Sequence, residues 1–205
     1  MERQSAYQYP GNNSVIFHIH RLKSVRVVDY VIKFSRVWAM PNRETFKIKP
    51  IKELLSRYVG DGKGWVDPFA GDNSPAEYTN DLNQKTKAKS HLHWEDFIKT
   101  TPLEINGLLL DPPYSLRQME ECYDKIDKKM TFDESKDASY SRLKNKCKNN
   151  IITKGFAINF GWSTVGFGKK RGFEIIEILD VCHGGHHNDT LVTVERKVQQ
   201  NLNRK

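Results

Sequence analysis

Apolar residues recur with two different periods along the chain, and the period separates predicted helices from predicted strands. The segment KPIKELLSRYV (49–59) places Ile51, Leu54 and Leu55 on one helical face, which predicts a helix. The segment GLLLDPPY (107–114) instead holds a continuous apolar run. Such a run is typical of a strand that is buried on both sides of a parallel sheet.

The same patterns predict the order of the remaining elements. We expect helices over 115–128 and 134–149. Strands are predicted in WVDPFAG (65–71), YTNDLN (78–83), HLHWEDFI (91–98), KGFAINFGWS (154–163), FEIIEILDVCHGG (173–185) and HNDTLVTVERK (187–197), and two β-like runs, SVIFHIH (14–20) and VRVVDYVIKF (25–34), precede them. Strands alternating with connectors predict an α/β fold, with a mostly parallel doubly wound sheet that ends in an antiparallel hairpin.

Length and composition set the domain organisation. A chain of 205 residues is long enough for one domain with a sizeable core. We divide it into a basic N-terminal extension (1–39), an α/β domain (40–197) and a polar tail (198–205). No apolar run approaches the ~20 residues of a membrane span, so no membrane partner is expected. A polar N-terminus and three widely spaced cysteines favour a cytoplasmic location.

The charge is unevenly distributed. The formal net charge is +8, and residues 1–50 hold 9 Lys or Arg against 3 Asp or Glu. A basic protein of this size often binds a polyanion, although charge alone does not decide the partner. The basic turn Lys169-Lys170-Arg171 is one candidate for phosphate contacts, and solvated surface is the alternative.

Acidic residues follow three successive predicted strands. Asp67 ends the first, with Gly71 close behind it, Asp81 ends the second and Asp96 ends the third. Doubly wound sheets bind ligands at the carboxyl ends of their strands, where an acid can accept hydrogen bonds from ribose hydroxyls. The order of these residues indicates a nucleoside-containing cofactor, although each acid alone could be a helix cap or turn residue.

The fourth strand delivers Asp111-Pro112-Pro113-Tyr114 to the same edge. The prolines hold this loop rigid. The Asp111 carboxylate and the Pro112 carbonyl are acceptors that suit the two hydrogens of an exocyclic amine, and Tyr114 offers a ring on which a base can stack. The alternative is a Pro-Pro strand terminator with a surface tyrosine.

With its upstream DPFAG and KPIKELL, this DPPY segment resembles the amino-methyltransferases that modify N6 of adenine or N4 of cytosine in DNA. The resemblance covers about residues 40–197 and is closest to the small adenine-specific enzymes of phages and prophages. It implies a Rossmann-like fold and S-adenosyl-L-methionine as cofactor, and it makes 40–197 the catalytic domain. It also implies transfer of a methyl group to an exocyclic base amine of DNA, with adenine N6 favoured.

The resemblance assigns roles to individual residues. The catalytic loop would be Asp111, Pro112, Pro113 and Tyr114. The cofactor would be held by Asp67, Pro68, Phe69, Ala70, Gly71, Asp81, Asp96 and Phe97, with Phe46, Lys49 and Pro50 lining its pocket less directly. Gly161 and Trp162 would form a further wall for the target base, and no metal is implied.

Two departures from the family pattern limit the interpretation. The segment GDNS (71–74) replaces the usual G-x-G-T, and only six residues separate Gly71 from the next strand, which leaves room for about one helical turn. We expect Asn73 to tolerate a positive φ in place of glycine. The long inserted segment that reads DNA sequence in the family is missing, so specificity would be loose or supplied by a homodimer or partner protein.

Alternatives therefore stay open. The same loop chemistry permits methylation of adenine or guanine in RNA. A catalytically weak nucleic-acid-binding protein that keeps the fold is a third interpretation. A zinc site at His183, His186 and His187 is less favoured, because only Asp189 stands near them at ligand spacing.

Overall fold

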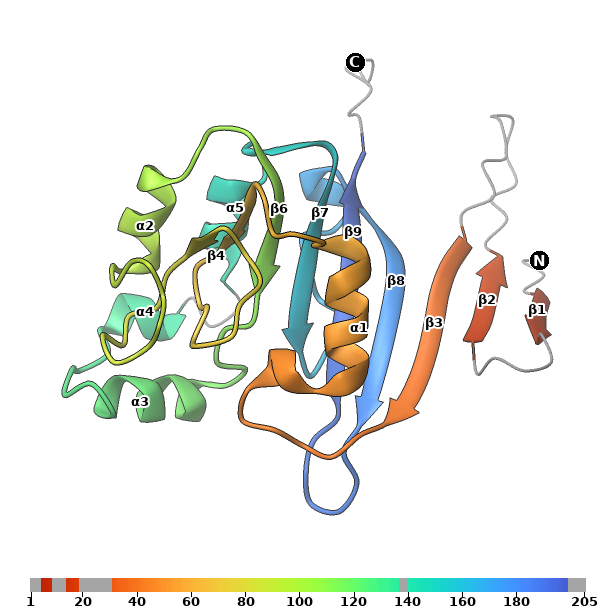
Figure 1. Cartoon of the computed structure of the whole chain (residues 1–205), viewed down its shortest axis with the longest axis horizontal. Helices are drawn as coiled ribbons and strands as arrows, with labels where there is room; N and C mark the ends of the chain where they lie inside the picture. Colours follow the sequence, from red (N-terminus) through yellow and green to blue (C-terminus); the bar gives the residue numbers. More distant parts are fainter. Residues whose placement is uncertain (1–4, 9–13, 19–30, 137–139, 199–205) are drawn as a thin grey trace.

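One mixed sheet organises the molecule. The computed structural model describes residues 5–8, 14–18, 31–136 and 140–198, and within them nine strands lie in the order β1-β2-β3-β8-β9-β7-β6-β4-β5 (Figure 1). The strands are β1 (Ser5–Gln8), β2 (Ser14–His18), β3 (Val31–Trp38), β4 (Trp65–Asp67), β5 (Tyr78–Thr79), β6 (Ile105–Leu110), β7 (Ile151–Gly161), β8 (Phe173–Cys182) and β9 (Thr190–Lys197).

Short helices connect and cover these strands. The α-helices are α1 (Lys49–Tyr58), α2 (Trp94–Thr100), α3 (Leu116–Asp124), α4 (Phe132–Lys136) and α5 (Ser141–Cys147), and two 3-10 turns are η1 (Thr45–Lys47) and η2 (Lys169–Arg171). The helix predicted from KPIKELLSRYV is confirmed as α1, with Ile51, Leu54 and Leu55 buried.

The strand directions bring the predicted acids to one edge. β5, β4, β6 and β7 run parallel to one another, while β9 lies between β7 and β8 and is antiparallel to both. The predicted antiparallel ending is thus confirmed. Because parallel strands end at the same edge of a sheet, the loops after β4, β5, β6 and β7 meet there.

Two apolar clusters, one on each face of the sheet, hold the layers together. On one face α1 packs over the middle strands with η1, Trp65 and Val181 (Figure 1). On the other face α2 and α5 pack against Val66, Leu108 and Phe173. Helices on both faces fix the doubly wound arrangement.

The strand predicted in HLHWEDFI is wrong, because this segment forms α2. Trp94, Phe97 and Ile98 are its buried residues, at the i, i+3, i+4 spacing of a helix. Its first turn holds Glu95 and Asp96, which suit the positive end of the helix dipole. A single parallel bridge between Asn80 and Ser90 is all that stands at the place of the third strand.

A clamped loop replaces a crossover helix between β7 and β8. The Glu195 carboxylate on β9 accepts hydrogen bonds from Phe167 N (2.6 Å), Gly168 N (2.8 Å) and Asn159 Nδ2 (3.0 Å). Gly166 passes so close that a Cβ there would lie 1.9 Å from Glu195 Oε2. The loop therefore lies flat against the sheet.

The boundary placed at residue 40 remains a prediction, and the structure adds one observation to it. β3 pairs in parallel with β8, from Lys33 opposite Glu177 to Trp38 opposite Cys182, so residues 31–38 belong to the same sheet. Much of the predicted extension (1–4, 9–13 and 19–30) and residues 199–205 of the predicted tail lie outside the described residues. Among the described residues, no helix combines the length and apolar character of a membrane span.

Candidate functional site

A cavity of about 610 Å³ opens at the edge where the parallel strands end. Its walls come from the segment before α1, the loops after β4, β5 and β6, the start of α2, and the α3–α4 segment. The predicted site residues among its lining are Phe46, Pro68, Phe69, Ala70, Gly71, Asp81, Asp111, Pro112, Pro113 and Tyr114. Of the four acids predicted at this edge, Asp81 and Asp111 line the cavity, whereas Asp67 and Asp96 do not.

Asp67 shapes this site from behind the cavity wall. It is fully buried at the end of β4 and accepts hydrogen bonds from Phe69 N (2.9 Å) and Ser74 Oγ (2.6 Å). Burial raises its pKa to about 7, against the lowering effect of these two hydrogen bonds. It does not line the cavity, so the predicted cofactor contact is replaced by a role in holding the loop.

Gly71 and Asp81 face each other across the cavity floor. Asp81 Oδ2 accepts the Gly71 N–H at 3.0 Å, and Oδ1 accepts the Asn83 N–H at 2.8 Å. Gly71 has φ +52°, and a Cβ built on it would meet nothing within 4 Å. Burial raises the pKa of Asp81, since its backbone hydrogen bonds offset desolvation only in part. The space beside Gly71 therefore borders the Asp81 carboxylate, whose oxygens can each accept a further hydrogen bond.

The GDNS segment is accommodated without a helix. Asp72 Oδ1 accepts the Lys87 N–H (2.9 Å), and Asn73 Nδ2 donates to Glu44 Oε1 (2.5 Å). Asn73 does not adopt a positive φ, so the expected substitution for glycine is wrong. Residues 72 and 73 belong to a turn, and 74–77 have no helical structure, so the single helical turn for which the spacing leaves room does not form. Asp72 therefore ties the neighbouring loop down at the cavity rim.

The DPPY segment forms the opposite wall. The Tyr114 hydroxyl donates to Asp111 Oδ1, and the Tyr114 N–H donates to Gln118 Oε1 (2.7 Å). Burial raises the pKa of Asp111, and hydrogen bonds from Tyr114 and Thr45 oppose that rise. Thr45, which the sequence reasoning did not single out, comes from η1, lines the cavity and acts to lower the pKa of Asp111.

Trp162 extends the Tyr114 wall outward. The two rings meet edge to face with centroids 5.8 Å apart, and the Trp162 side chain is 44% exposed. Gly161 ends β7 beside them, since a Cβ on it would approach Tyr114 at 4.0 Å. The predicted further wall therefore lies next to the DPPY segment, although neither residue is among those that line the cavity itself.

Four predicted cofactor residues lie away from the cavity. Asp96 is exposed on α2 and pairs with Lys99 (2.7 Å). Phe97 is buried in the core, and Lys49 and Pro50 begin α1 outside the lining. His93 and Trp94 occupy the wall where Asp96 and Phe97 were expected. Applying the helical spacing of Trp94, Phe97 and Ile98 would have identified this helix start.

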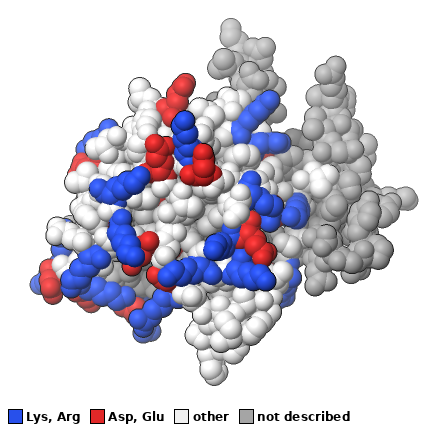
Figure 2. Space-filling model, viewed as in Figure 1, with Lys and Arg blue, Asp and Glu red and all other residues white. Residues whose placement is uncertain are grey.

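None of Lys169, Lys170 and Arg171 lines the cavity. They precede β8, whose first residue pairs with Lys197, near the amino end of β7. Arg171 is bound to α5 through Asn145 Oδ1 (2.8 Å) and Ser141 Oγ (2.7 Å). The predicted substrate contact is thus not supported by their position. On the face shown in Figure 2, Lys and Arg side chains lie in several groups with acids among them.

The histidine cluster and a nearby acidic group are internally bonded. His183 contacts Ala39 O and Thr190 Oγ1 through its two ring nitrogens, both at 2.9 Å. Asp180, Cys182 and Asp189 form a group with metal-ligand spacing. Arg36 lies among these three, 2.7 Å from Cys182 Sγ, 3.2 Å from Asp180 and 3.4 Å from Asp189. The Arg36 guanidinium therefore already supplies the positive charge that a metal ion would bring to these three side chains.

Comparison with known proteins identifies the fold. No protein-family model and no curated protein matches this chain. TrmN from Thermus thermophilus superposes with TM-score 0.51 at 16% identity, over 74% of this chain and 49% of its own. SMU.776, named as a candidate methyltransferase and solved with SAH, gives TM-score 0.51 at 11% identity, over 94% and 56%.

The chain has a Rossmann-like methyltransferase fold. It spans about half the length of both structures. The fold predicted from the strand pattern and the family resemblance is therefore confirmed.

Proposed function

We propose that this protein is an S-adenosyl-L-methionine-dependent methyltransferase that acts on an exocyclic base amine, with N6 of adenine in DNA as the favoured target. The observation that carries the proposal is that two sets of residues line the same cavity. Gly71 and Asp81 form a nucleoside-binding wall, and Asp111 and Tyr114 form an amine-binding wall.

The charge of the cavity fits this cofactor. Six acidic residues (Glu44, Asp72, Asp81, Asp111, Glu121 and Glu134) and three basic ones (Arg43, Lys125 and Arg142) line it. An acid-rich lining suits a cofactor with a sulfonium and an ammonium group. A dinucleotide would instead need a helix N-terminus for its pyrophosphate directly after β4, and residues 72–77 contain no helix. SMU.776, which shares the fold, was solved with SAH.

The residues divide the chemistry between them. Bound S-adenosyl-L-methionine supplies an already activated methyl group. Asp81 would accept hydrogen bonds from the ribose hydroxyls, while Asp67 keeps the Phe69–Ser74 loop in place. Asp111 would accept a hydrogen of the target amine, which turns its lone pair toward the methyl group. Tyr114 would carry the base, which must leave the duplex stack to reach this cavity.

In this structure the Tyr114 hydroxyl donates to Oδ1 of Asp111 and so takes up part of the hydrogen-bonding capacity of that carboxylate. The incoming amine therefore has to replace that hydroxyl.

The DNA assignment rests on the resemblance of KPIKELL, DPFAG and DPPY to DNA enzymes. RNA methylation is the second candidate, because DPPY also occurs in RNA methyltransferases. Incubation with methyl-labelled S-adenosyl-L-methionine and DNA, RNA or no polymer separates them. We expect label in N6-methyladenine of DNA. Label in RNA alone would make RNA methylation the favoured function. The absence of transfer to either polymer would favour the third interpretation, a nucleic-acid-binding protein that keeps the fold.

The matched variant is Asp111→Ala. It should abolish transfer and leave cofactor binding nearly intact, because Asp111 faces the target amine and Asp81 faces the cofactor. Equal loss of both would show that Asp111 serves the cofactor instead.

A further inference from the structure

The α3–α4 segment covers one side of the cavity, and we refer to residues 116–136 as the lid. Eight lid residues line the cavity: Gln118, Met119, Glu121, Cys122, Tyr123, Lys125, Ile126 and Glu134. A ligand in the cavity would therefore contact the lid over much of its surface.

The lid is weakly anchored by apolar packing. Met119 is the one buried side chain among the lid residues whose side chains the structure describes. Neither core cluster includes a lid residue. Segments with few buried apolar contacts open at low free energy, so the lid is expected to move independently of the sheet.

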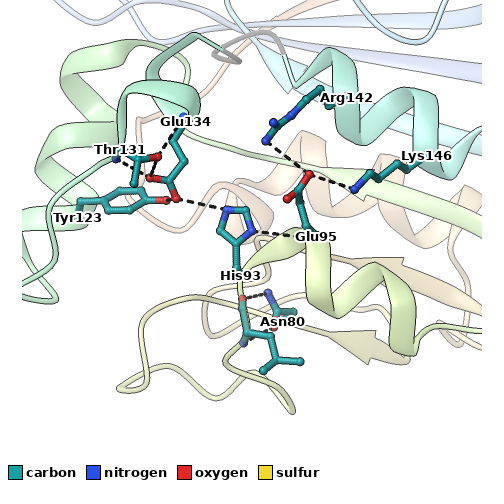
Figure 3. Close-up of polar contacts among 9 residues, drawn as sticks. Asn80, His93, Glu95, Tyr123, Thr131, Glu134, Arg142 and Lys146 are labelled. Atoms are coloured by element: carbon teal, nitrogen blue, oxygen red, sulfur yellow. Dashed lines mark hydrogen bonds and ion pairs between the residues drawn. The ribbon is translucent and has the colours of Figure 1, made fainter.

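Polar contacts organise the lid around Glu134. Its carboxylate accepts hydrogen bonds from Tyr123 Oη (2.6 Å), Thr131 N (2.6 Å) and Thr131 Oγ1 (2.7 Å), all within the lid (Figure 3). These bonds join α3 to α4 and hold the carboxylate in one orientation. They also lower the pKa of Glu134 against the opposing effect of burial.

The same carboxylate reaches out of the lid to His93. His93 Nε2 lies 3.3 Å from Glu134 Oε1, at ion-pair distance but without an aligned hydrogen bond. Its Nδ1 accepts the Glu95 N–H at 3.4 Å as the N-cap of α2. The capping bond turns Nε2 toward the lid, as Figure 3 shows.

The residues around His93 fix it firmly to the body of the protein. Asn80 binds both backbone groups of Leu92, accepting its N–H (2.9 Å) and donating to its carbonyl (3.0 Å). Glu95 is held by Lys146 (3.0 Å) and Arg142 (3.5 Å) on α5. The position of His93 is thus fixed by its neighbours, whereas the lid beside it is only weakly anchored.

We propose that the contact between His93 and Glu134 is a latch that holds the lid closed, and that its opening sets how fast the cofactor enters and leaves. The latch itself follows from the geometry alone. Only the identity of the ligand rests on the proposed function.

Hydrogen–deuterium exchange on the ligand-free protein tests the latch. His93→Asn keeps a good N-cap for α2 and removes the ring. Glu134→Gln keeps one acceptor oxygen, enough for the Thr131 N–H and hydroxyl that share Oε2, and places an NH2 donor at the position that faces Tyr123 Oη and His93. Each should speed exchange of residues 116–136 by about threefold to tenfold, the range expected for one ordinary hydrogen bond or partly exposed polar contact. The control Arg117→Gln breaks the lid's internal pair with Glu121 (3.0 Å) and should leave that exchange unchanged.

The double variant decides whether the two residues act on each other. Exchange in His93→Asn with Glu134→Gln should match that of the faster single variant, because the latch is already broken. Unchanged lid exchange in the single variants, or additive effects in the double variant, would overturn the proposal.

Stopped-flow dissociation of S-adenosyl-L-homocysteine then tests the consequence. Trp94 lines the cavity and its ring centroid lies 5.5 Å from that of His93, which makes it a fluorescence reporter. Dissociation should speed up in both latch variants and not in Arg117→Gln. Faster lid exchange with unchanged dissociation would contradict the link to the cofactor. Failure of the wild-type protein to bind the probe would count against the proposed function and leave the exchange result standing.

Discussion

Two carboxyl groups at the ends of neighbouring strands, the buried Asp67 and the half-buried Asp111, have different surroundings. Asp67 is enclosed and accepts hydrogen bonds from Phe69 N and Ser74 Oγ, whereas Asp111 faces the cavity and accepts the Tyr114 hydroxyl, which we propose that a substrate replaces. Sequence reasoning placed both at strand ends and expected a cofactor contact from Asp67, whereas the structure places Asp67 behind the cavity wall. The distinction depends on how the loop after each strand folds back.

The raised pKa of Asp67 predicts a specific pH dependence of stability. Its folded pKa of about 7 exceeds the ordinary value of 3.8, so the folded state binds more protons between these values. Stability should fall as pH rises across this window, by at most about 4 kcal/mol from this group, and level off above pH 7.

Asp67→Asn should remove that part of the pH dependence, because an amide can still accept from Phe69 N and donate to Ser74 Oγ. Urea unfolding of both proteins at several pH values from 4 to 8 measures the difference. Burial also raises the pKa of Asp81, Asp111 and Glu195, so only the difference between the two proteins is diagnostic. Parallel stability curves would show that Asp67 does not titrate in this range.

Tyr114 combines a stacking ring with a hydroxyl that competes for Asp111. Tyr114→Phe keeps the ring and frees the carboxylate, so methyl transfer should be retained within a few-fold or increased. Tyr114→Ala should lower kcat/KM about 5- to 150-fold, corresponding to ~1–3 kcal/mol of base stacking. Single-turnover assays with one polymer compare the three proteins. If Phe and Ala are equally damaging, the hydroxyl rather than the ring is the essential group.

Among the elements, the loop between β7 and β8 shows how a short connection is stabilised without a helix. Gly166→Ala would push a methyl group into Glu195 Oε2 (1.9 Å) and Asn159 Nδ2 (2.8 Å), which are held by the clamp. We expect a loss of ~1–3 kcal/mol, typical of overpacking.

Gly161→Ala is the matched control in the same segment, since the nearest atoms to its Cβ lie at 4.0 Å. It should change stability little. The urea midpoints of both variants and the wild type give the comparison, and equal midpoints for Gly166→Ala and the wild type would mean that the loop relaxes easily.

The elements also show where sequence reasoning succeeds and fails. α1, the buried β6 strand and the final hairpin follow from clear periods, as predicted. HLHWEDFI was misread because its length and aromatic content fit a strand, while the spacing of Trp94, Phe97 and Ile98 fits a helix. Because of that one error, Asp96 was expected at the cavity, and His93 was not identified as a residue that lines it.

At the scale of the whole molecule, the cavity depends on contacts between segments that no local pattern reveals. Glu134, His93 and Thr45 reach the site from helical segments rather than from strand ends. Lys169–Arg171 were misplaced because a basic turn carries no signal of which sheet edge it occupies. The acids Asp81 and Asp111 were found because strand direction alone determines their edge.

The account as a whole depends on one cavity holding S-adenosyl-L-methionine between Asp81 and Asp111. Titration calorimetry measures this most directly, with NAD as the competing ligand class. Asp61→Ala is the control for Asp81→Ala, because Asp61 also accepts a backbone N–H two residues ahead (Lys63, 3.0 Å) but lies exposed outside the cavity.

We predict saturable 1:1 binding of S-adenosyl-L-methionine that weakens at least about tenfold in Asp81→Ala, in line with a lost hydrogen bond to a charged group. Binding should be unchanged in Asp61→Ala, and NAD should not bind. No binding of S-adenosyl-L-methionine, equal binding of NAD, or indifference to Asp81→Ala would contradict the account.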